Sequence, residues 1–145
     1  MIRVALLGIV AATLAAGCGG DGGTSVVWEG PPRPLAENGA LPSDGFNAYL
    51  EATEQPWEAS VTAVATAYAL PLAGDASSVQ TASAPEGASP VTVTIGGVLD
   101  DSVAELRLTL TLERNDDRWT ATEATWAQRC RPGRGHQDFS PEPCL

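Results

Sequence analysis

The sequence predicts an α+β fold in which two N-terminal helices pack on a curved antiparallel β-meander. Three observations predict it. Apolar residues recur every three or four positions between residues 44 and 70, which is the period of an amphipathic helix. They alternate with polar residues between residues 91 and 130, which is the period of a half-buried strand. Short Asp/Asn runs near residues 100 and 116 interrupt the alternation, as turns between antiparallel strands do.

The first predicted helix spans residues 44–54. Ser43 is a suitable N-cap, because a serine oxygen accepts a hydrogen bond from a free backbone N–H of the first turn. Phe46, Tyr49 and Leu50 fall on one side of this helix. That side is expected to cover the sheet.

A second helix is predicted to begin at Pro56, a residue favoured in the first turn, and to run to about Leu70, where Pro71 is expected to end it. Its apolar residues recur at steps of four, three and four: Trp57, Val61, Val64 and Tyr68. The alternative is a strand over residues 61–68, because this stretch is rich in valine and threonine. The spacing favours the helix.

The strands are expected after residues 74–90, a loop with one edge strand around residues 78–82. Three longer strands follow over residues 91–95, 103–113 and 118–130, the last of which carries Trp119 and Trp126. Helices followed by such a sheet are compatible with a cystatin-like or a nuclear-transport-factor-2-like arrangement. This is an analogy of fold and implies no activity.

The N-terminus has the features of a bacterial lipoprotein signal. One positive charge at Arg3 precedes 13 apolar residues, too few to span a bilayer, which end in the lipobox-like string Leu14-Ala15-Ala16-Gly17-Cys18. The leucine lies one position earlier than is usual. Residues 1–17 are therefore predicted to be a signal peptide and Cys18 to carry diacylglycerol. The alternative is an ordinary secreted protein cut after an Ala-x-Ala-like site.

This signal predicts a lipid-anchored protein on the extracytoplasmic face of the cell membrane. Residues 18–40 are rich in glycine and proline and are predicted to form a flexible tether, with a short strand at residues 26–28 as a further feature. Residues 41–145 are predicted to form one domain. Residues 18–145 carry all 18 acidic residues against seven arginines and no lysine, a net charge of −11. Such acidity argues against binding of nucleic acid or anionic lipid by the folded body.

The cysteines fit the same compartment. If Cys18 is lipidated, Cys130 and Cys144 remain as a pair in an oxidising environment, and a disulfide is predicted between them. Closing a loop of this size stabilises a fold by about 3 kcal/mol in the chain-entropy model. Two free or metal-bound thiols are the alternative.

One segment, residues 128–144, resembles a binding site. Three of the seven arginines of the mature chain lie there beside the only histidine: Arg129, Arg131, Arg134 and His136. Gly133 and Gly135 permit positive φ angles, and one hypothesis is that consecutive backbone N–H groups and the arginines bind an anion or an acidic partner. The alternative is a disulfide-stapled cap, which the composition of the segment favours over this hypothesis. Its arginines would pair with Asp138, Glu142 and carboxylates of the sheet, and Phe139 would fill the core.

The same segment carries a resemblance to a known group of proteins. The strings Gln128-Arg129-Cys130 and Gly133-Arg134-Gly135-His136-Gln137-Asp138-Phe139-Ser140, together with residues 46–49, 56–58 and 100–103, resemble small uncharacterised actinobacterial lipoproteins with the same ending. The resemblance covers residues 43–144. It implies the domain limits and the location, and no activity, ligand or catalytic residue.

Catalytic and metal-binding patterns are weak. A Ser-His-Asp or Cys-His site would have to use His136, and a disulfide removes the nearest nucleophile. Zinc binding by Cys130, His136, Asp138 and Cys144 matches no usual spacing, and oxidised cysteines cannot bind zinc. The acidic pairs at residues 100–101 and 116–117 suit turns better than calcium sites. The four tryptophans suit a core better than a carbohydrate platform, although Trp28, beside the predicted tether, has no clear core role. No catalytic residue, metal or cofactor is expected.

These observations predict a non-catalytic binding or accessory module, anchored to the membrane by its N-terminal lipid, whose partner is an envelope protein or an anionic ligand. Nucleic acid is not an expected partner. One alternative is a small hydrolase or isomerase with a pocket between helices and sheet. The other is a purely structural envelope protein.

Overall fold

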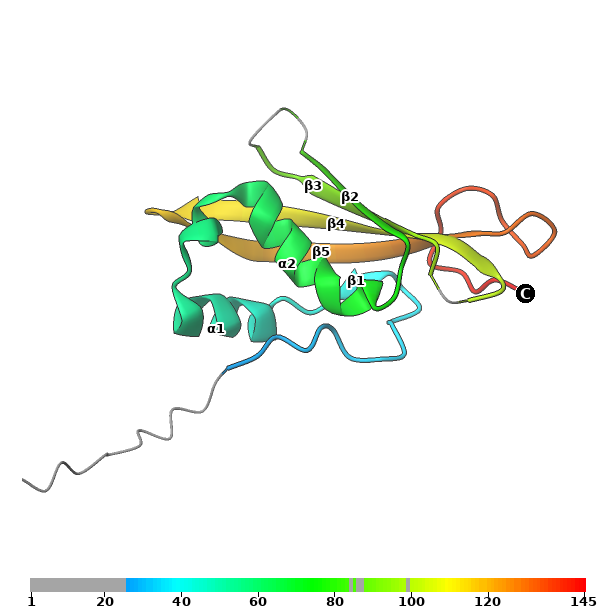
Figure 1. Ribbon diagram of the computed structural model, residues 1–145, viewed down its shortest axis with the longest axis horizontal. Coiled ribbons are helices and arrows are strands. Elements are labelled where there is room, and N and C mark those ends of the chain that lie inside the picture. The colour runs from blue at the N-terminus through cyan, green and yellow to red at the C-terminus, as the bar shows by residue number, and fades with distance from the viewer. Residues whose placement is uncertain (1–25, 84, 86–87, 99) are drawn as a thin grey trace, which may run out of the picture.

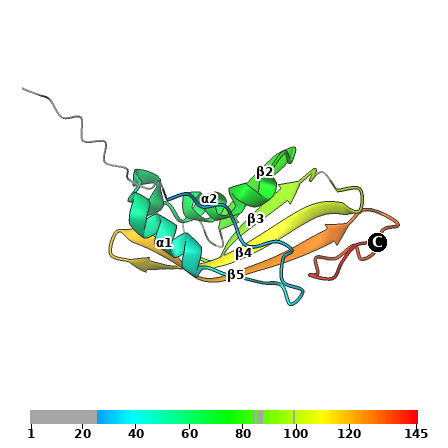
Figure 2. The ribbon, with the colours of Figure 1, turned by 90° about the horizontal axis from the view of Figure 1, so that it is seen from below.

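The computed structural model describes residues 26–145 apart from residues 84, 86–87 and 99. The predicted signal peptide and Cys18 lie outside the described residues. Helices α1 (Asp44–Thr53) and α2 (Val61–Ala73), joined by the 3₁₀ turn η1 (Pro56–Ala59), lie on one face of a five-stranded antiparallel sheet (Figures 1 and 2). The predicted α+β class, with helices first and an antiparallel sheet after them, is confirmed.

The sheet is a meander with one added edge strand. Its strands follow the order β1-β5-β4-β3-β2 and comprise β1 (Ala40–Leu41), β2 (Ser78–Ser83), β3 (Val91–Gly96), β4 (Val103–Asn115) and β5 (Arg118–Cys130). The predicted edge strand and the three longer strands are confirmed. The two-residue strand β1 pairs with β5 at Thr125 and Ala124 and was not predicted, because two residues carry no period.

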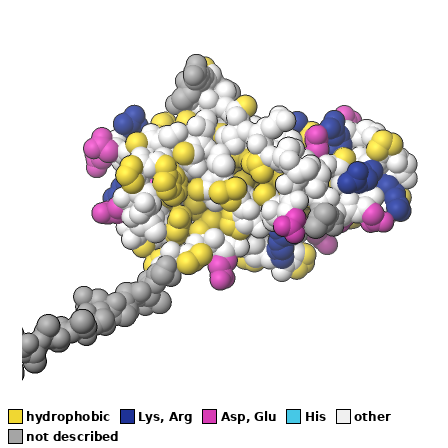
Figure 3. Space-filling model, viewed as in Figure 1, with side chains coloured by type: hydrophobic (Ala, Val, Ile, Leu, Met, Phe, Trp, Pro, Cys, Tyr) yellow, Lys and Arg dark blue, Asp and Glu magenta, His cyan; other side chains and the backbone are white. Residues whose placement is uncertain are grey.

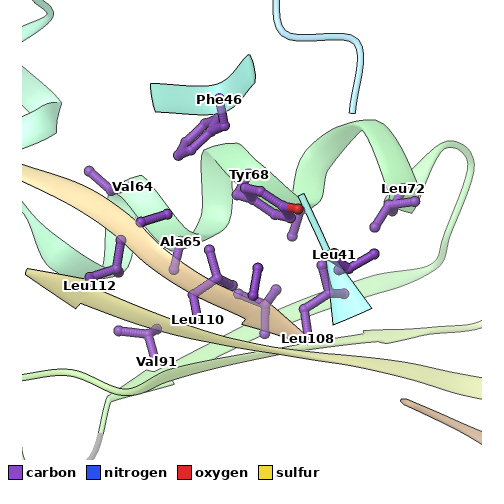
Figure 4. Packing of buried hydrophobic residues seen from close by; sticks show 14 of the residues in the cluster. Leu41, Phe46, Val64, Ala65, Tyr68, Leu72, Val91, Leu108, Leu110 and Leu112 are labelled. Atoms are coloured by element: carbon purple, nitrogen blue, oxygen red, sulfur yellow. The ribbon is translucent and has the colours of Figure 1, made fainter. Parts of the chain in front are cut away.

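Alternation along β4 separates the two faces of the sheet. Leu108, Leu110 and Leu112 are buried beneath the helices, so Arg107 and Thr109, on either side of Leu108, lie on the opposite face. Figure 2 shows no helix on that second face. Figure 4 shows the leucines below Phe46 of α1 and Tyr68 of α2. The buried cluster also includes Leu41, Leu50, Val61, Val64, Ala65, Ala69, Leu72, Val91, Val93, Ile95 and Trp126.

Helix α1 forms where it was predicted. Phe46 and Leu50 are buried, and Tyr49 is partly buried against the core. Ser43 occupies the N-cap position, but its side chain makes no capping hydrogen bond. Glu54 ends the helix in a left-handed conformation with a φ of 46°. The amphipathic period therefore located this helix correctly, whereas the expected capping contact is absent.

The second predicted helix is broken in two at Ser60. Ser60 is extended, with φ −101° and ψ 118°, and its hydroxyl accepts the backbone N–H of Ala63 at 3.4 Å. It therefore caps α2 and separates it from η1, which carries Trp57. Val61, Val64 and Tyr68 share the buried face of α2, so the alternative strand is wrong.

Pro71 does not end the helix, which continues to Ala73. The proline lacks the N–H that would bond to the carbonyl of Ala67, and only two helical residues follow it, so the helix ends within the same turn. The chain before α1 also crosses α2 here: a Cβ added at Gly30 would lie 2.8 Å from the Cβ of Pro71. Packing against this segment adds a contact that no local pattern reveals.

Residues 26–40, predicted to belong to the tether, pack on the domain instead. Residues 26–28 form no strand. The Trp28 ring lies 5.2 Å from the rings of both Phe46 and Tyr68, and its indole N–H donates to the Tyr68 carbonyl at 3.0 Å. Leu35 also packs against the core. Ordered structure thus begins before Leu41, because this aromatic cluster holds the segment in place.

Tyr68 is the polar group at the centre of this cluster. Its side chain is fully buried, and its hydroxyl donates to the carbonyl of Pro42 at 2.7 Å. Burial raises the pKa of Tyr68 to about 12, because the charged phenolate loses its hydration in the core.

Candidate functional site

The C-terminal loop is stapled to the end of β5. Cys130 and Cys144 form the predicted disulfide, with their Cα atoms 5.5 Å apart. Between them, Ser140 exchanges two backbone hydrogen bonds with Gln128, at 2.8 and 3.0 Å. The loop therefore lies along the edge of β5 next to β1, at the end of the molecule far from α1 (Figure 1).

The first loop arginine is paired with the sheet. The Arg129 guanidinium contacts the Glu105 carboxylate at 2.7 Å, and the two residues are register partners on β5 and β4. This pair lies on the face opposite the helices, because Leu106 and Gln128 beside it point inward.

The other two arginines contact the connection that joins β3 to β4. Arg131 donates to the Asp100 carbonyl at 3.3 Å, and Arg134 contacts the Asp101 carboxylate at 3.2 Å. The cap alternative named Asp138 and Glu142 as partners, but no ion pair among the described residues involves them. Instead β4 and β5 bring residues more than 30 positions apart into contact. Each arginine therefore has a partner within the chain.

Phe139 does not fill the core. It is partly exposed, and the guanidinium carbons of Arg107 and Arg129 lie 3.5 and 5.4 Å from its ring centroid. Since both arginines point away from the helices, Phe139 covers the outer face of the sheet with two cation–π contacts. The expectation of a core plug is wrong, because sequence does not show from which side the loop returns.

His136 is held between two backbone carbonyls. Its Nδ1 lies 2.7 Å from the Asp138 oxygen, and its Nε2 lies 2.9 Å from the Glu142 oxygen. Both acceptors are satisfied only by the imidazolium, so the Glu142 carbonyl and then the Asp138 carbonyl raise the pKa of His136. A ring engaged in this way is a poor general base or metal ligand.

Metal ligation is blocked by oxidation. The ligand atoms of Cys130, His136 and Cys144 lie within 4.8 Å of one another, and among the described residues they form a group with the spacing of a metal site. The two sulfurs are bonded to each other and cannot act as thiolates. Asp138, considered as a fourth zinc ligand, is not part of this group.

The acidic pairs form turns. One carboxylate oxygen of Asp100 accepts both N–H and hydroxyl of Ser102, each at 2.7 Å, and the N–H of Val103 at 3.0 Å. These hydrogen bonds, above all those from Ser102, lower the pKa of Asp100. Asp116 adopts a φ of 56° in the turn between β4 and β5. The turn interpretation of both pairs agrees with this geometry.

The largest hollow of the described surface is a groove on the helical face. It has a volume of about 730 Å³ and lies beside α2, between the segment at Trp28 and strand β2. Figure 3 shows apolar side chains gathered over the middle of this face and charged side chains toward its ends. The described residues that line the groove carry no charge: Trp28, Tyr49, Trp57, Thr62, Ala63, Thr66, Ala67, Leu70, Pro71 and Thr81. We call this surface the helical-face groove.

Sequence reasoning missed this groove. Trp126 belongs to the buried cluster, and its indole N–H donates to the Ala36 carbonyl at 2.9 Å. Trp119 packs against the cluster from outside. Trp28 and Trp57 also pack against the cluster, and both line the groove. Trp28 had no clear core position in the sequence, which was the one available signal.

A second cavity, of about 470 Å³, lies between the C-terminal end of α2 and the sheet. Its apolar lining comes from residues such as Leu72, Leu106 and Trp126. Its polar lining consists of Arg33, Asp75, Asp100 and Gln128. This is the kind of pocket that the hydrolase or isomerase alternative requires, but His136 does not line it.

Comparisons with known proteins assign no family. No protein-family model matches the chain, and neither curated proteins nor solved structures give a match. In the part of the chain that the structure describes, no helix has the length and apolar character needed to cross a membrane.

Proposed function

We propose that this protein is a lipid-anchored module of the cell envelope that acts by binding, without catalysis, through the helical-face groove. Cys18 carries the lipid, and the folded domain lies on the extracytoplasmic face of the cell membrane. The groove is the observation that carries the binding role. Its aromatic and apolar walls are typical of surfaces that bind other molecules.

The chemistry of the described residues favours binding over catalysis. Both ring nitrogens of His136 lie within hydrogen-bond distance of backbone carbonyls, the cysteines near it are oxidised, and the engaged oxygen of Asp100 already accepts three hydrogen bonds. A general base needs a free lone pair within reach of a substrate proton. These groups are committed to holding the loop and the turn.

Metabolic labelling with a clickable fatty acid tests the anchor. The wild-type protein and the matched control Cys144→Ser are expected to take up label, and Cys18→Ser is expected to remain unlabelled. Equal labelling of all three proteins would contradict lipidation at Cys18. The protein would then have to reach the envelope by another route.

Photo-crosslinking in intact cells tests the binding role. A benzophenone side chain replaces Leu70, which lines the groove and is 55% exposed, or Glu123, an exposed residue of β5 whose partner is Thr111 on the outer face. The position-70 variant is expected to form adducts with protein or lipid, and the position-123 variant far fewer. Equal yields at both positions would count against the groove as the binding surface.

The second cavity supports a second candidate function, the binding of a small and mostly apolar molecule. Its volume of about 470 Å³ lies within the range of small-molecule sites, and Arg33 and Asp75 supply charges of both signs at its wall. Native mass spectrometry of the protein isolated from its own cells tests this candidate. A bound small molecule that is lost from Leu72→Trp, a substitution that fills the cavity, would support it.

A further inference from the structure

Exposed apolar side chains of the described residues gather where the chain comes from its proposed anchor. Four large apolar residues are strongly exposed: Val26, Val27, Leu70 and Leu145. Leu70 lines the helical-face groove, and Val26 and Val27 directly precede Trp28, which lines it too. Three of the four therefore lie in the groove or directly before a residue that lines it, and two of these are the first described residues.

The length of chain outside the structure limits how far this surface can lie from the membrane. Seven residues separate Cys18 from Val26, and fully extended they span roughly 25 Å. Because the lipid on Cys18 is held at the membrane surface, this span is the upper limit on the distance between Val26 and that surface. A domain held this closely at Val26 keeps the adjoining surface within reach of the lipid headgroups.

The composition of the surface fits the headgroup region of a bilayer. Trp28, Tyr49 and Trp57 line the groove. The chain has four tryptophans and two tyrosines, so half of these six residues lie there. Tryptophan and tyrosine favour the boundary between water and hydrocarbon, because one end of each ring system is polar and the rest is apolar. The Trp28 indole N–H is already bonded to the Tyr68 carbonyl, so that ring can enter an apolar region without losing a partner in water.

The charge distribution points to the same orientation. The chain has a net charge of −10, which disfavours contact of most of its surface with acidic lipids. The lining of the groove carries no charge among the described residues, and Figure 3 shows charged side chains toward the ends of this face. This face can therefore approach a zwitterionic headgroup layer with the least desolvation of charge.

We propose that the helical-face groove and the exposed Val26 and Val27 beside it rest in the interfacial layer of the bilayer that holds the lipid anchor. This inference rests on the proposed anchoring at Cys18. In this orientation the outer face of the sheet points away from the membrane. The stapled C-terminal loop, at one end of the molecule, lies to the side of the contact.

Nitroxide labelling of the full-length, lipidated protein tests this orientation. Leu70→Cys introduces a thiol in a chain whose other cysteines are then acylated or oxidised, so that a spin label attaches there alone. Val27→Cys, at a side chain that is 68% exposed, serves as a second labelling site should the first variant fold poorly. Glu123→Cys is the matched control. Each protein is reconstituted into phosphatidylcholine vesicles, and collision with oxygen, which concentrates in lipid, is compared with collision with a water-soluble nickel chelate.

Labels at residues 70 and 27 are expected to collide several-fold more with oxygen than with the nickel chelate, and the label at residue 123 is expected to show the reverse. Equal access of the chelate to all three labels would overturn the inference. So would labels at residues 70 and 27 that are shielded from both reagents, which would indicate a second copy or a protein partner on the groove. Fatty-acid labelling of the same samples separates the two proposals: a lipidated protein with water-exposed labels contradicts the orientation alone, and an unlipidated protein contradicts the anchor first.

Discussion

The helical face and the C-terminal loop differ in how their chemical groups are satisfied. Arg129, Arg131 and Arg134 of the loop each have a partner within the chain, and the His136 ring lies between two carbonyls. On the helical face, by contrast, no other part of the described chain covers the apolar side chains of the groove, and Leu70 is 55% exposed. A cluster of arginines in the sequence is therefore a weak indication of a ligand site here, because carboxylates and a carbonyl of the same chain already bind these arginines. Uncovered aromatic surface is the stronger sign.

The chain's two phenylalanines provide the largest test of this contrast, one in each region. Phe46→Ala removes a fully buried ring from the cluster with Tyr68 and Trp28, and it is expected to lower the free energy of unfolding by about 3–5 kcal/mol. Phe139→Ala removes a partly exposed ring over Arg107 and is expected to cost about 1 kcal/mol. Urea denaturation of both variants measures the difference. Similar losses would mean that the loop is as much a part of the core as α1.

Removal of the disulfide is expected to have the next largest effect. The double variant Cys130→Ser, Cys144→Ser is expected to lose about 3 kcal/mol of stability, because the unfolded chain is no longer constrained by the closed loop. Urea denaturation of the wild type with and without reductant provides the control, since reduction should produce the same loss. A variant as stable as the oxidised protein would show that the staple is not needed for the fold.

Tyr68 is expected to make the stability of the helical layer sensitive to alkaline pH. Its pKa is raised to about 12, whereas in the unfolded chain it has the ordinary value of 10.0. The stabilising contribution is complete below pH 10 and is lost as the pH rises toward 12, because only the unfolded chain then releases the proton. The loss reaches up to about 3 kcal/mol. Denaturation between pH 8 and pH 11 measures it, and Tyr68→Phe is expected to flatten this part of the profile.

The loop arginines are expected to contribute little to stability. Arg134 and Asp101 are exposed by 48% and 88% at their side chains, so their ion pair is screened by solvent. The double variant Arg131→Gln, Arg134→Gln is expected to lose about 1 kcal/mol or less. Crosslinking from position 70 should remain unchanged in it. If these arginines bind an anionic partner, as the sequence suggests, recovery of that partner in pull-downs should fall and become sensitive to salt.

The smallest expected effect concerns His136. Its pKa is raised above 6.5, because the Glu142 and Asp138 carbonyls accept hydrogen bonds from its two ring nitrogens. The loop is thus favoured below pH 6.5, and this contribution is lost as the pH rises through the raised pKa and one nitrogen ceases to donate. The chain has one histidine, so its ring signals in an NMR titration are unambiguous. A midpoint at or below 6.5 would contradict the pair of contacts.

Most of the fold was predictable because its signals are local. The alternating leucines of β4 and the spacing of Val61, Val64 and Tyr68 report which face is buried whatever covers it. The break at Ser60 and the helical position of Pro71 were not predictable. They depend on the packing of η1 against β5 and of the segment before α1 against Pro71, and these contacting segments are distant from each other in sequence.

The candidate sites divide in the same way. The disulfide followed from counting cysteines, and the positive φ angles of Gly133 and Gly135 followed from residue type. The partners of Arg131 and Arg134 did not, since Asp100 and Asp101 lie more than 30 residues away. The groove left a single trace, a tryptophan without a clear place in the core.

By itself the sequence determined the α+β class, the limits of α1 and of the four longer strands, and the pairing of Cys130 with Cys144. These depend on residue period and on composition, which act over a few positions or by simple count. Tertiary structure alone decided that Trp28 packs against the aromatic cluster, that Phe139 lies on the outer face of the sheet, and that the groove remains open. The physical reason is that burial and hydrogen-bond pairing depend on which surfaces meet, and segments far apart in the chain meet only when the whole domain has folded.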